Sequence, residues 1–229
     1  MRVCAMPKCA VRGCKISPSP DPTDALDALL ADVRACTLCA AHLPLGPRPV
    51  LQVHGSAKIL IAGQAPGRKV HESGVPFDDA SGERLRAWLG VSRSTFYDSR
   101  QINILPMGFC YPGTGTSGDL PPRPECATAW RTQLLAHLKS IQLTLVLGQY
   151  ALDFHLPVVH LPVFRVPVAA GPAAQSVTAK VLDWRKHWPQ FIALPHPSPR
   201  NNPWLKRNPW FEAELLPELK IRVAQVLAA

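Results

Sequence analysis

Apolar and polar positions divide the chain into alternating strand-like and helix-like segments. Four apolar runs of five to seven residues, each bounded by turn residues, are typical of buried strands: 57–62, 101–107, 143–148 and 191–195. Apolar residues at helical spacing occupy the segments around these runs: 24–33, 81–90, 124–139, 149–155 and 211–227, the last interrupted by Pro217. Strands that alternate with helices predict an α/β fold, a three-layer α/β/α sandwich around a central, mainly parallel, four-stranded sheet.

The two ends of the chain differ in this periodicity. Residues 1–23 carry four basic side chains and three cysteines among several prolines, with no apolar repeat. We therefore expect a loose basic tail over 1–23 and a single α/β domain over 24–229. A length of 229 residues agrees with one domain and an appendage.

Charge and proline content narrow the class of protein. Lys and Arg outnumber Asp and Glu by 25 to 16, which gives a net charge of +9. A chain this basic favours polyanionic partners such as nucleic acid. The 25 prolines are scattered along the sequence and mark loops, which argues against helical bundles and coiled coils.

Targeting signals are absent from the sequence pattern. No apolar stretch approaches the length of a membrane helix, and the first residues lack the apolar core of a secretory signal. We expect a cytoplasmic protein of a bacterial-type cytosol, associated with the nucleoid and with no membrane partner. In such a reducing compartment the seven cysteines are expected to be thiols or metal ligands.

Ligands of parallel sheets bind beyond the carboxyl ends of the strands, so the residues after each apolar run are the candidates for a site. The first run is followed by Gly-Gln-Ala-Pro-Gly at 63–67 and then by 74–82. No phosphate-loop signature accompanies these glycines. We expect a rigid rim that brings backbone amides and the ring of Phe77 to a flat ligand. The alternatives are a core position for Phe77 and a helix N-cap for Asp79.

Two other apolar runs have a polar residue of interest, one within the run and one directly after it. Asn103 lies in an otherwise apolar strand, where a buried amide needs hydrogen-bond partners, so a ligand contact and a structural bond to a neighbouring loop are both open. His196 follows the last run, in a stiff loop with two prolines that places it in the crevice. The basic and aromatic residues of 200–210 suit phosphates and stacked bases.

Cysteine spacing adds a second kind of site. Cys36 and Cys39 form a CxxC pair, and Cys110 and Cys126 follow as distant single residues. A pair and two singles can hold a [4Fe–4S] cluster or a zinc ion, whereas a zinc ribbon carries two CxxC pairs. Unrelated buried thiols are the alternative.

The combined motifs resemble those of the uracil-DNA glycosylase superfamily, especially its family-four and family-five members. Those families have a Gly-x-Ala-Pro-Gly motif, a Gly-x-Pro-Phe, a strand Asn, a terminal His-Pro-Ser and four cluster-ligating cysteines. The matching elements here are 63–67, 74–77, Asn103, 196–199 and the four cysteines named above. Over residues 24–215 of this chain, these elements follow one another in the same order as in those families.

The resemblance implies a DNA repair enzyme that extrudes uracil from DNA and hydrolyses its N-glycosidic bond, leaving an abasic site. Phe77 would stack on the base, and the Asn103 amide would pair with N3–H and O4. His196 would donate to O2 as charge builds on the leaving base. Asp79 would steady the cationic sugar or orient water.

The resemblance also implies further contacts and a cofactor. Gln64 and Ala65 would belong to the substrate pocket, and the DNA contacts would come from Ser198, Arg200 and Asn201. The four cysteines would bind a [4Fe–4S] cluster as a structural brace, with zinc as the alternative metal. The partner would be DNA containing uracil or another deaminated base, bound by a monomer.

The chain departs from its relatives at particular positions. Family-one enzymes carry an acidic residue where this chain has Ala65, and many family-four members carry Glu at the position of Gln64. Asp79-Ala80-Ser81-Gly82 is similar to a family-five element, but its spacing from Phe77 is one residue shorter. Two other classes remain open: a non-catalytic Fe–S or zinc nucleic-acid-binding module, and a nucleotide-binding oxidoreductase or phosphotransferase.

Overall fold

The computed structural model describes residues 22–116, 118–156 and 176–229. The tail predicted for 1–23, with its three cysteines, lies almost entirely outside the described residues. The first described element is helix α1 (Pro22–Arg34), in the place where the apolar spacing predicts a helix. No helix of the described part of the chain combines the length and apolar character needed to cross a membrane.

The four apolar runs form one parallel sheet, as predicted. Its strands are β1 (Ile59–Ala62), β2 (Ile102–Ile104), β5 (Leu143–Leu147) and β6 (Phe191–Leu194). Their spatial order is β2-β1-β5-β6, and every neighbouring pair is parallel. Because the strands are parallel, all four carboxyl ends lie at one edge of the sheet.

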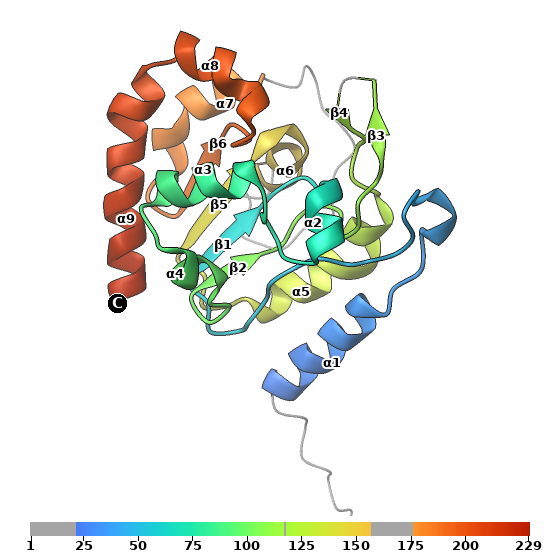
Figure 1. Ribbon diagram of the computed structural model, residues 1–229. Helices are drawn as coiled ribbons and strands as arrows, with labels where there is room; N and C mark the ends of the chain where they lie inside the picture. Colours follow the sequence, from blue (N-terminus) through green and yellow to red (C-terminus); the bar gives the residue numbers. More distant parts are fainter. Residues whose placement is uncertain (1–21, 117, 157–175) are drawn as a thin grey trace, which may run out of the picture.

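Helices surround this sheet (Figure 1). The α-helices after α1 are α2 (Arg68–Ser73), α3 (Ala80–Leu89), α4 (Arg93–Tyr97), α5 (Thr132–His137), α6 (Gly148–His155), α7 (Val177–Leu182), α8 (Asn202–Arg207) and α9 (Leu216–Ala228). Shorter 3-10 and π segments are η1 (Ala40–His42), η2 (Ala127–Arg131), η4 (Trp184–His187), η5 (Pro199–Asn201) and η6 (Phe211–Leu215). A small antiparallel hairpin joins β3 (Thr114–Gly115) and β4 (Gly118–Asp119).

Alternate side chains of β1 enter two apolar clusters on opposite faces of the sheet. Leu60 packs with residues of α1 and α5, such as Leu30 and Leu134. Ile59 and Ile61 belong to the other cluster, which includes residues of α3 and α9. The chain therefore has the three-layer α/β/α arrangement that the sequence predicts.

The structure differs in detail from the prediction in two segments. The stretch after His196 was expected to be a loop, but it forms η5 and α8. Pro217 was expected to interrupt the last helix. It instead lies in the first turn of α9, where a proline costs no intrahelical hydrogen bond, and the preceding turn is the π segment η6.

Candidate active site at the carboxyl ends of the strands

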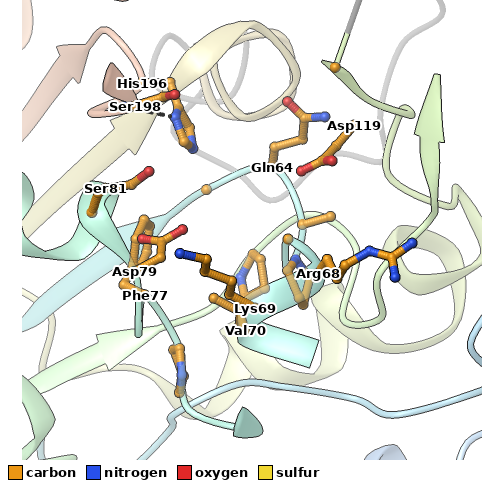
Figure 2. Close-up of a pocket in the computed structure, with 18 of the residues that line it drawn as sticks. Gln64, Arg68, Lys69, Val70, Phe77, Asp79, Ser81, Asp119, His196 and Ser198 are labelled. Atoms are coloured by element: carbon orange, nitrogen blue, oxygen red, sulfur yellow. Dashed lines mark hydrogen bonds between the residues drawn. The ribbon is translucent and has the colours of Figure 1, made fainter. Parts of the chain in front are cut away.

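A cavity of about 540 Å³ opens at the carboxyl ends of the strands. Its walls come from the loops after β1 and β6, the end of β2, the first turns of α2 and α3, and the β4 strand. Figure 2 shows His196 and Ser198 above the cavity, with Phe77 and Asp79 on one side. The predicted residues that line it are Gln64, Ala65, Phe77, Asp79, His196, Ser198, Arg200 and Asn201.

The imidazole of His196 has a defined tautomer. The backbone N–H of Ser198 donates to Nδ1 at 3.2 Å, so Nδ1 is an acceptor and the ring proton lies on Nε2. Burial lowers the pKa of His196, and this effect outweighs the carboxylates of Asp79 and Asp119, which raise it. The ring is therefore neutral at pH 7 and presents an N–H donor to the cavity.

The loop that carries His196 is held by several hydrogen bonds. The Asn201 side-chain amide donates to the carbonyl of His196 at 2.7 Å. Arg84 of α3 donates to the carbonyl of Ser198 at 3.0 Å. The Ser198 hydroxyl accepts from the backbone N–H of Arg200 at 3.3 Å. These bonds fix the loop against α3, so the imidazole needs little reorganisation to act.

Phe77 lies in a strained backbone conformation beside the cavity. Its φ is +55°, the single positive value of a non-glycine residue in the described part of the chain. The Tyr97 hydroxyl donates to the Phe77 carbonyl at 3.3 Å. The ring edge reaches Gly63, where a Cβ would lie 3.5 Å from Cζ of Phe77. Strain of this kind persists where the surroundings enforce it, often at functional sites.

Asp79 has a structural role as well as a place in the cavity wall. Its Oδ1 accepts from the backbone N–H of Gly82 at 2.9 Å, which makes Asp79 the N-cap of α3. The helix-cap alternative is thus correct. Because the cap uses Oδ1, Oδ2 remains for a ligand, and its position is fixed by the cap.

The first motif is clamped to the neighbouring strand end. The carbonyls of Gly63 and Gln64 accept from the backbone N–H groups of Met107 and Gly108 at 2.8 and 2.9 Å. The Gln64 side chain donates through Nε2 to the carbonyl of Leu120 at 3.2 Å. Ala65 follows on the cavity wall.

Asn103 does not reach the cavity. It is fully buried, its Oδ1 accepts from the backbone N–H of His54 at 2.7 Å, and its Nδ2 donates to the His54 carbonyl at 3.1 Å. Ile104, the next residue of β2, lines the cavity instead. The prediction that Asn103 contacts the base is therefore wrong, and the alternative of a structural bond to a neighbouring loop is correct.

The aromatic residues after His196 also face the protein. The Trp204 indole N–H donates to the Thr178 hydroxyl at 2.8 Å, and its ring packs edge-on against Trp210 and Phe211. These rings support α8 and η6, so the expected stack of bases on them has no support in the structure. Arg200, in contrast, is exposed at the rim.

Three charged residues of the cavity were not among the predicted site residues. Arg68 and Lys69 begin α2, directly after the first motif, and both are exposed. Two basic residues after a glycine-rich loop were a usable signal for an anion-binding rim. Asp119 comes from the two-residue strand β4, which has no hydrophobic pattern to mark it.

A buried cation supports the end of β2 behind the cavity. Arg131 is fully buried, and its Nη1 donates to the carbonyls of Leu105 and Pro106 at 2.8 and 2.6 Å. Its Nη2 donates to Nε2 of His155 at 2.6 Å. Burial and the nearby guanidinium lower the pKa of His155 to about 3, so this imidazole is neutral. Pro106 lines the cavity, so the pair holds part of its wall.

The charge of at least one other cysteine of the predicted cluster contributes to the raised pKa of Cys39, of Cys110 and of Cys126. Burial, with smaller contributions from the charges of Cys36 and Cys39, raises the pKa of Cys110 to about 12 and that of Cys126 to about 11. The Trp130 indole N–H donates to the sulfur of Cys36 at 3.2 Å. Their all-thiol donor set suits zinc or an iron–sulfur cluster. Among the described residues, however, no three or more His, Cys, Asp or Glu side chains are arranged to hold a single metal ion.

The sequence of this cavity-bearing domain matches a known family. The family model described as the uracil DNA glycosylase superfamily matches residues 52–220, which include the whole parallel sheet and every predicted residue of the cavity wall. The match covers well over half of the chain. The chain therefore belongs to the uracil DNA glycosylase superfamily and is a DNA glycosylase, a hydrolase of base excision repair.

Proposed function

We propose that this DNA glycosylase removes uracil from DNA by hydrolysing the bond between N1 of the base and C1′ of the deoxyribose. The observation that carries the proposal is the neutral imidazole of His196, which presents an Nε2–H donor to a cavity bordered by an aromatic ring. Uracil must leave the duplex to enter such a cavity, and base-flipping enzymes offset that cost with contacts in the pocket.

His196 stabilises the leaving group. When the N1–C1′ bond breaks, its electron pair goes to the base, and part of the resulting charge lies on O2. Nε2–H of His196 donates to that oxygen, while Nδ1 is held by the N–H of Ser198. A donor that is already oriented stabilises developing charge without reorganisation.

Phe77 and Asp79 act on the two partners of that bond. The Phe77 ring provides a flat apolar surface for the extruded base. Oδ2 of Asp79 orients the attacking water or stabilises positive charge on the sugar, because Oδ1 is occupied by the cap of α3. The water oxygen bonds to C1′, the proton that this water loses neutralises the uracil anion, and an abasic site and free uracil result.

The rim of the cavity carries cations that suit a phosphate backbone. Arg68, Lys69 and Arg200 are all exposed there. Lys and Arg side chains that neutralise phosphates supply most of the sequence-independent affinity for DNA. The η5 segment, with Ser198 and Asn201, brings Arg200 to the rim, and we propose that this segment contacts the strand that holds the flipped nucleotide.

We further propose that Cys36, Cys39, Cys110 and Cys126 bind a [4Fe–4S] cluster. Burial and the charges of neighbouring cysteines raise the pKa values of the Cys39, Cys110 and Cys126 thiols, and a shared, positively charged group would stabilise their thiolate forms. The cluster would connect the segment after α1 to the 110–126 region, and none of its four ligands lines the cavity. Zinc is the alternative, and metal analysis separates the two.

The test is a glycosylase assay with the purified chain on oligonucleotides that carry one uracil, hypoxanthine, xanthine or mismatched thymine. We expect release of free uracil and an alkali-sensitive abasic site in the uracil oligonucleotide. Release of another base without uracil would contradict the uracil assignment. Binding of every oligonucleotide without release of any base would contradict the catalytic mechanism.

A further inference from the structure

The β3–β4 hairpin brings a second carboxylate into the cavity, one that the mechanism above leaves unused. Asp119 lines the cavity from β4. A Cβ on Gly67 would lie 3.4 Å from Oδ2 of Asp119, so the carboxylate lies close to the first motif. Figure 2 shows Asp119 beside Gln64, with Phe77 and Asp79 on the other side of the view.

Several hydrogen bonds hold the hairpin in this position. The Leu120 backbone N–H donates to the carbonyl of Gly113 at 2.8 Å, and the Leu120 carbonyl accepts from Gln64. The Thr114 hydroxyl lies 2.5 Å from the hydroxyl of Tyr111 and donates to Oδ1 of Asp119 at 3.4 Å. Oδ1 thus has a partner in the hairpin, whereas Oδ2 lies against the first motif.

The wall formed by Gln64 and Asp119 offers acceptors to a ligand. Gln64 directs its amide nitrogen toward Leu120, and its Oε1 makes no hydrogen bond in the described structure, so this oxygen is an acceptor for a ligand. An ionised carboxylate is an acceptor only. The amide of Asn103, which could have offered both a donor and an acceptor, is occupied by His54. The Asp119 carboxylate therefore favours a ligand edge that carries an N–H group.

We propose that Asp119 is a specificity-determining residue that accepts a hydrogen bond from the ring N–H of the extruded base, which is N3–H in uracil. The inference rests on the proposed function, because it assigns the base edge that the same cavity reads. O2 and N3–H are neighbours on the uracil ring, so one base can contact His196 through O2 and Asp119 through N3–H. Both residues line the same cavity, and the Asp119 carboxylate is near enough to act on the charge of His196.

This contact distinguishes uracil from cytosine by the chemistry of one ring atom. N3 of uracil carries a hydrogen, whereas N3 of cytosine carries a lone pair. With cytosine, its N3 lone pair would face the Asp119 carboxylate, so two acceptors would oppose each other and neither would be paired. A site that recognises its substrate through such a hydrogen bond discriminates between similar bases far better than a site that recognises shape alone.

The first experiment replaces the carboxylate with its near-isosteric amide. Asp119→Asn should lower the single-turnover rate divided by the half-saturating enzyme concentration on uracil-containing DNA by roughly 10- to 100-fold, the effect of losing a hydrogen bond to a charged group. Glu212→Gln is the matched control. It removes the same charge from an exposed position on η6, outside the cavity, and should leave the rate unchanged.

The second experiment tests the ring N–H directly with two free bases. Free uracil and 3-methyluracil differ at N3, where the methyl group replaces the hydrogen. Uracil should inhibit the wild-type enzyme, and 3-methyluracil should inhibit it at least tenfold less. In Asp119→Ala this preference should largely disappear, because the variant has lost the acceptor and gained room for the methyl group. A purely structural role of Asp119 would lower the activity but keep the preference.

The outcomes separate this inference from the proposed function. A wild-type enzyme that releases no uracil overturns both. A wild-type enzyme that releases uracil, together with an Asp119→Asn variant of equal rate and an unchanged preference for uracil over 3-methyluracil, overturns the role of Asp119 alone.

Discussion

The carbonyl oxygen of Phe77 lies 1.8 Å from the position that a Cβ on Gly82 would occupy. No real side chain fits at that distance, so residue 82 must be glycine for the Phe77 carbonyl to turn toward α3. The same carbonyl accepts a hydrogen bond from Tyr97. The strained backbone that presents the Phe77 ring to the cavity therefore depends on a residue five positions later.

Gly82→Ala should accordingly displace Phe77 and the cap formed by Asp79. We expect the melting temperature to fall by roughly 3–10 °C, the range for overpacking a filled site, and uracil excision to fall with it. Gly55→Ala is the matched control, because a Cβ there meets its nearest neighbours at 3.7 Å and 4.0 Å. Equal melting temperatures for the two variants would contradict the close approach.

The buried pair of Arg131 and His155 predicts sensitivity to acid. His155 is neutral in the folded state because its pKa is lowered to about 3, whereas in the unfolded chain it gains a proton near pH 6.5. The unfolded state therefore binds more protons between these values, and the folded state loses stability as the pH falls. This one group contributes a slope of up to about 1.4 kcal/mol per pH unit.

His155→Gln keeps an acceptor for Arg131 and removes the titration. Urea unfolding between pH 4.5 and 7.5 should give a steeper loss of stability in the wild type than in the variant. His196, whose pKa is also lowered, contributes to both proteins equally and cancels in the difference. Identical slopes would mean that His155 is not held neutral in the folded protein.

The proposed cluster predicts a coloured protein. We expect anaerobically purified wild type to be brown, with iron and acid-labile sulfide in equal amounts and broad visible absorption. Cys126→Ser should lose the colour and much of the solubility, because a buried ligand is removed from the brace. Cys14→Ser, in the part of the chain outside the described residues, is the control and should keep both. A colourless, zinc-containing and fully active protein would exclude iron.

The strands and the main site residues could be predicted because two physical rules apply to them directly. Short apolar runs between turn residues form buried strands, and parallel strands bring their carboxyl ends to one edge. The segments 63–67, 77–79 and 196–201 follow such runs or lie in the next loop, and all of their residues except Asp78 and Pro197 line one cavity.

The failures also have physical causes. Alternate residues of a strand face opposite sides, so Asn103 points toward His54 while Ile104 reaches the cavity. Composition alone does not tell which face a single polar residue takes in a strand that is apolar on both. Asp119 comes from a hairpin with two-residue strands, which are too short for a periodic pattern. Its position depends on the hydrogen bond that Thr114 donates to it and on the bond that Gln64 donates to the carbonyl of the next residue, Leu120.

The most direct test of the mechanism compares the wild type with His196→Ala on one uracil-containing oligonucleotide. Losing a single preorganised donor to a developing oxyanion typically lowers a rate by about 10²–10³-fold. We expect the single-turnover excision rate to fall by that factor while the affinity for the oligonucleotide stays nearly the same, since phosphate contacts dominate binding. Excision at the wild-type rate by His196→Ala would contradict the proposed mechanism.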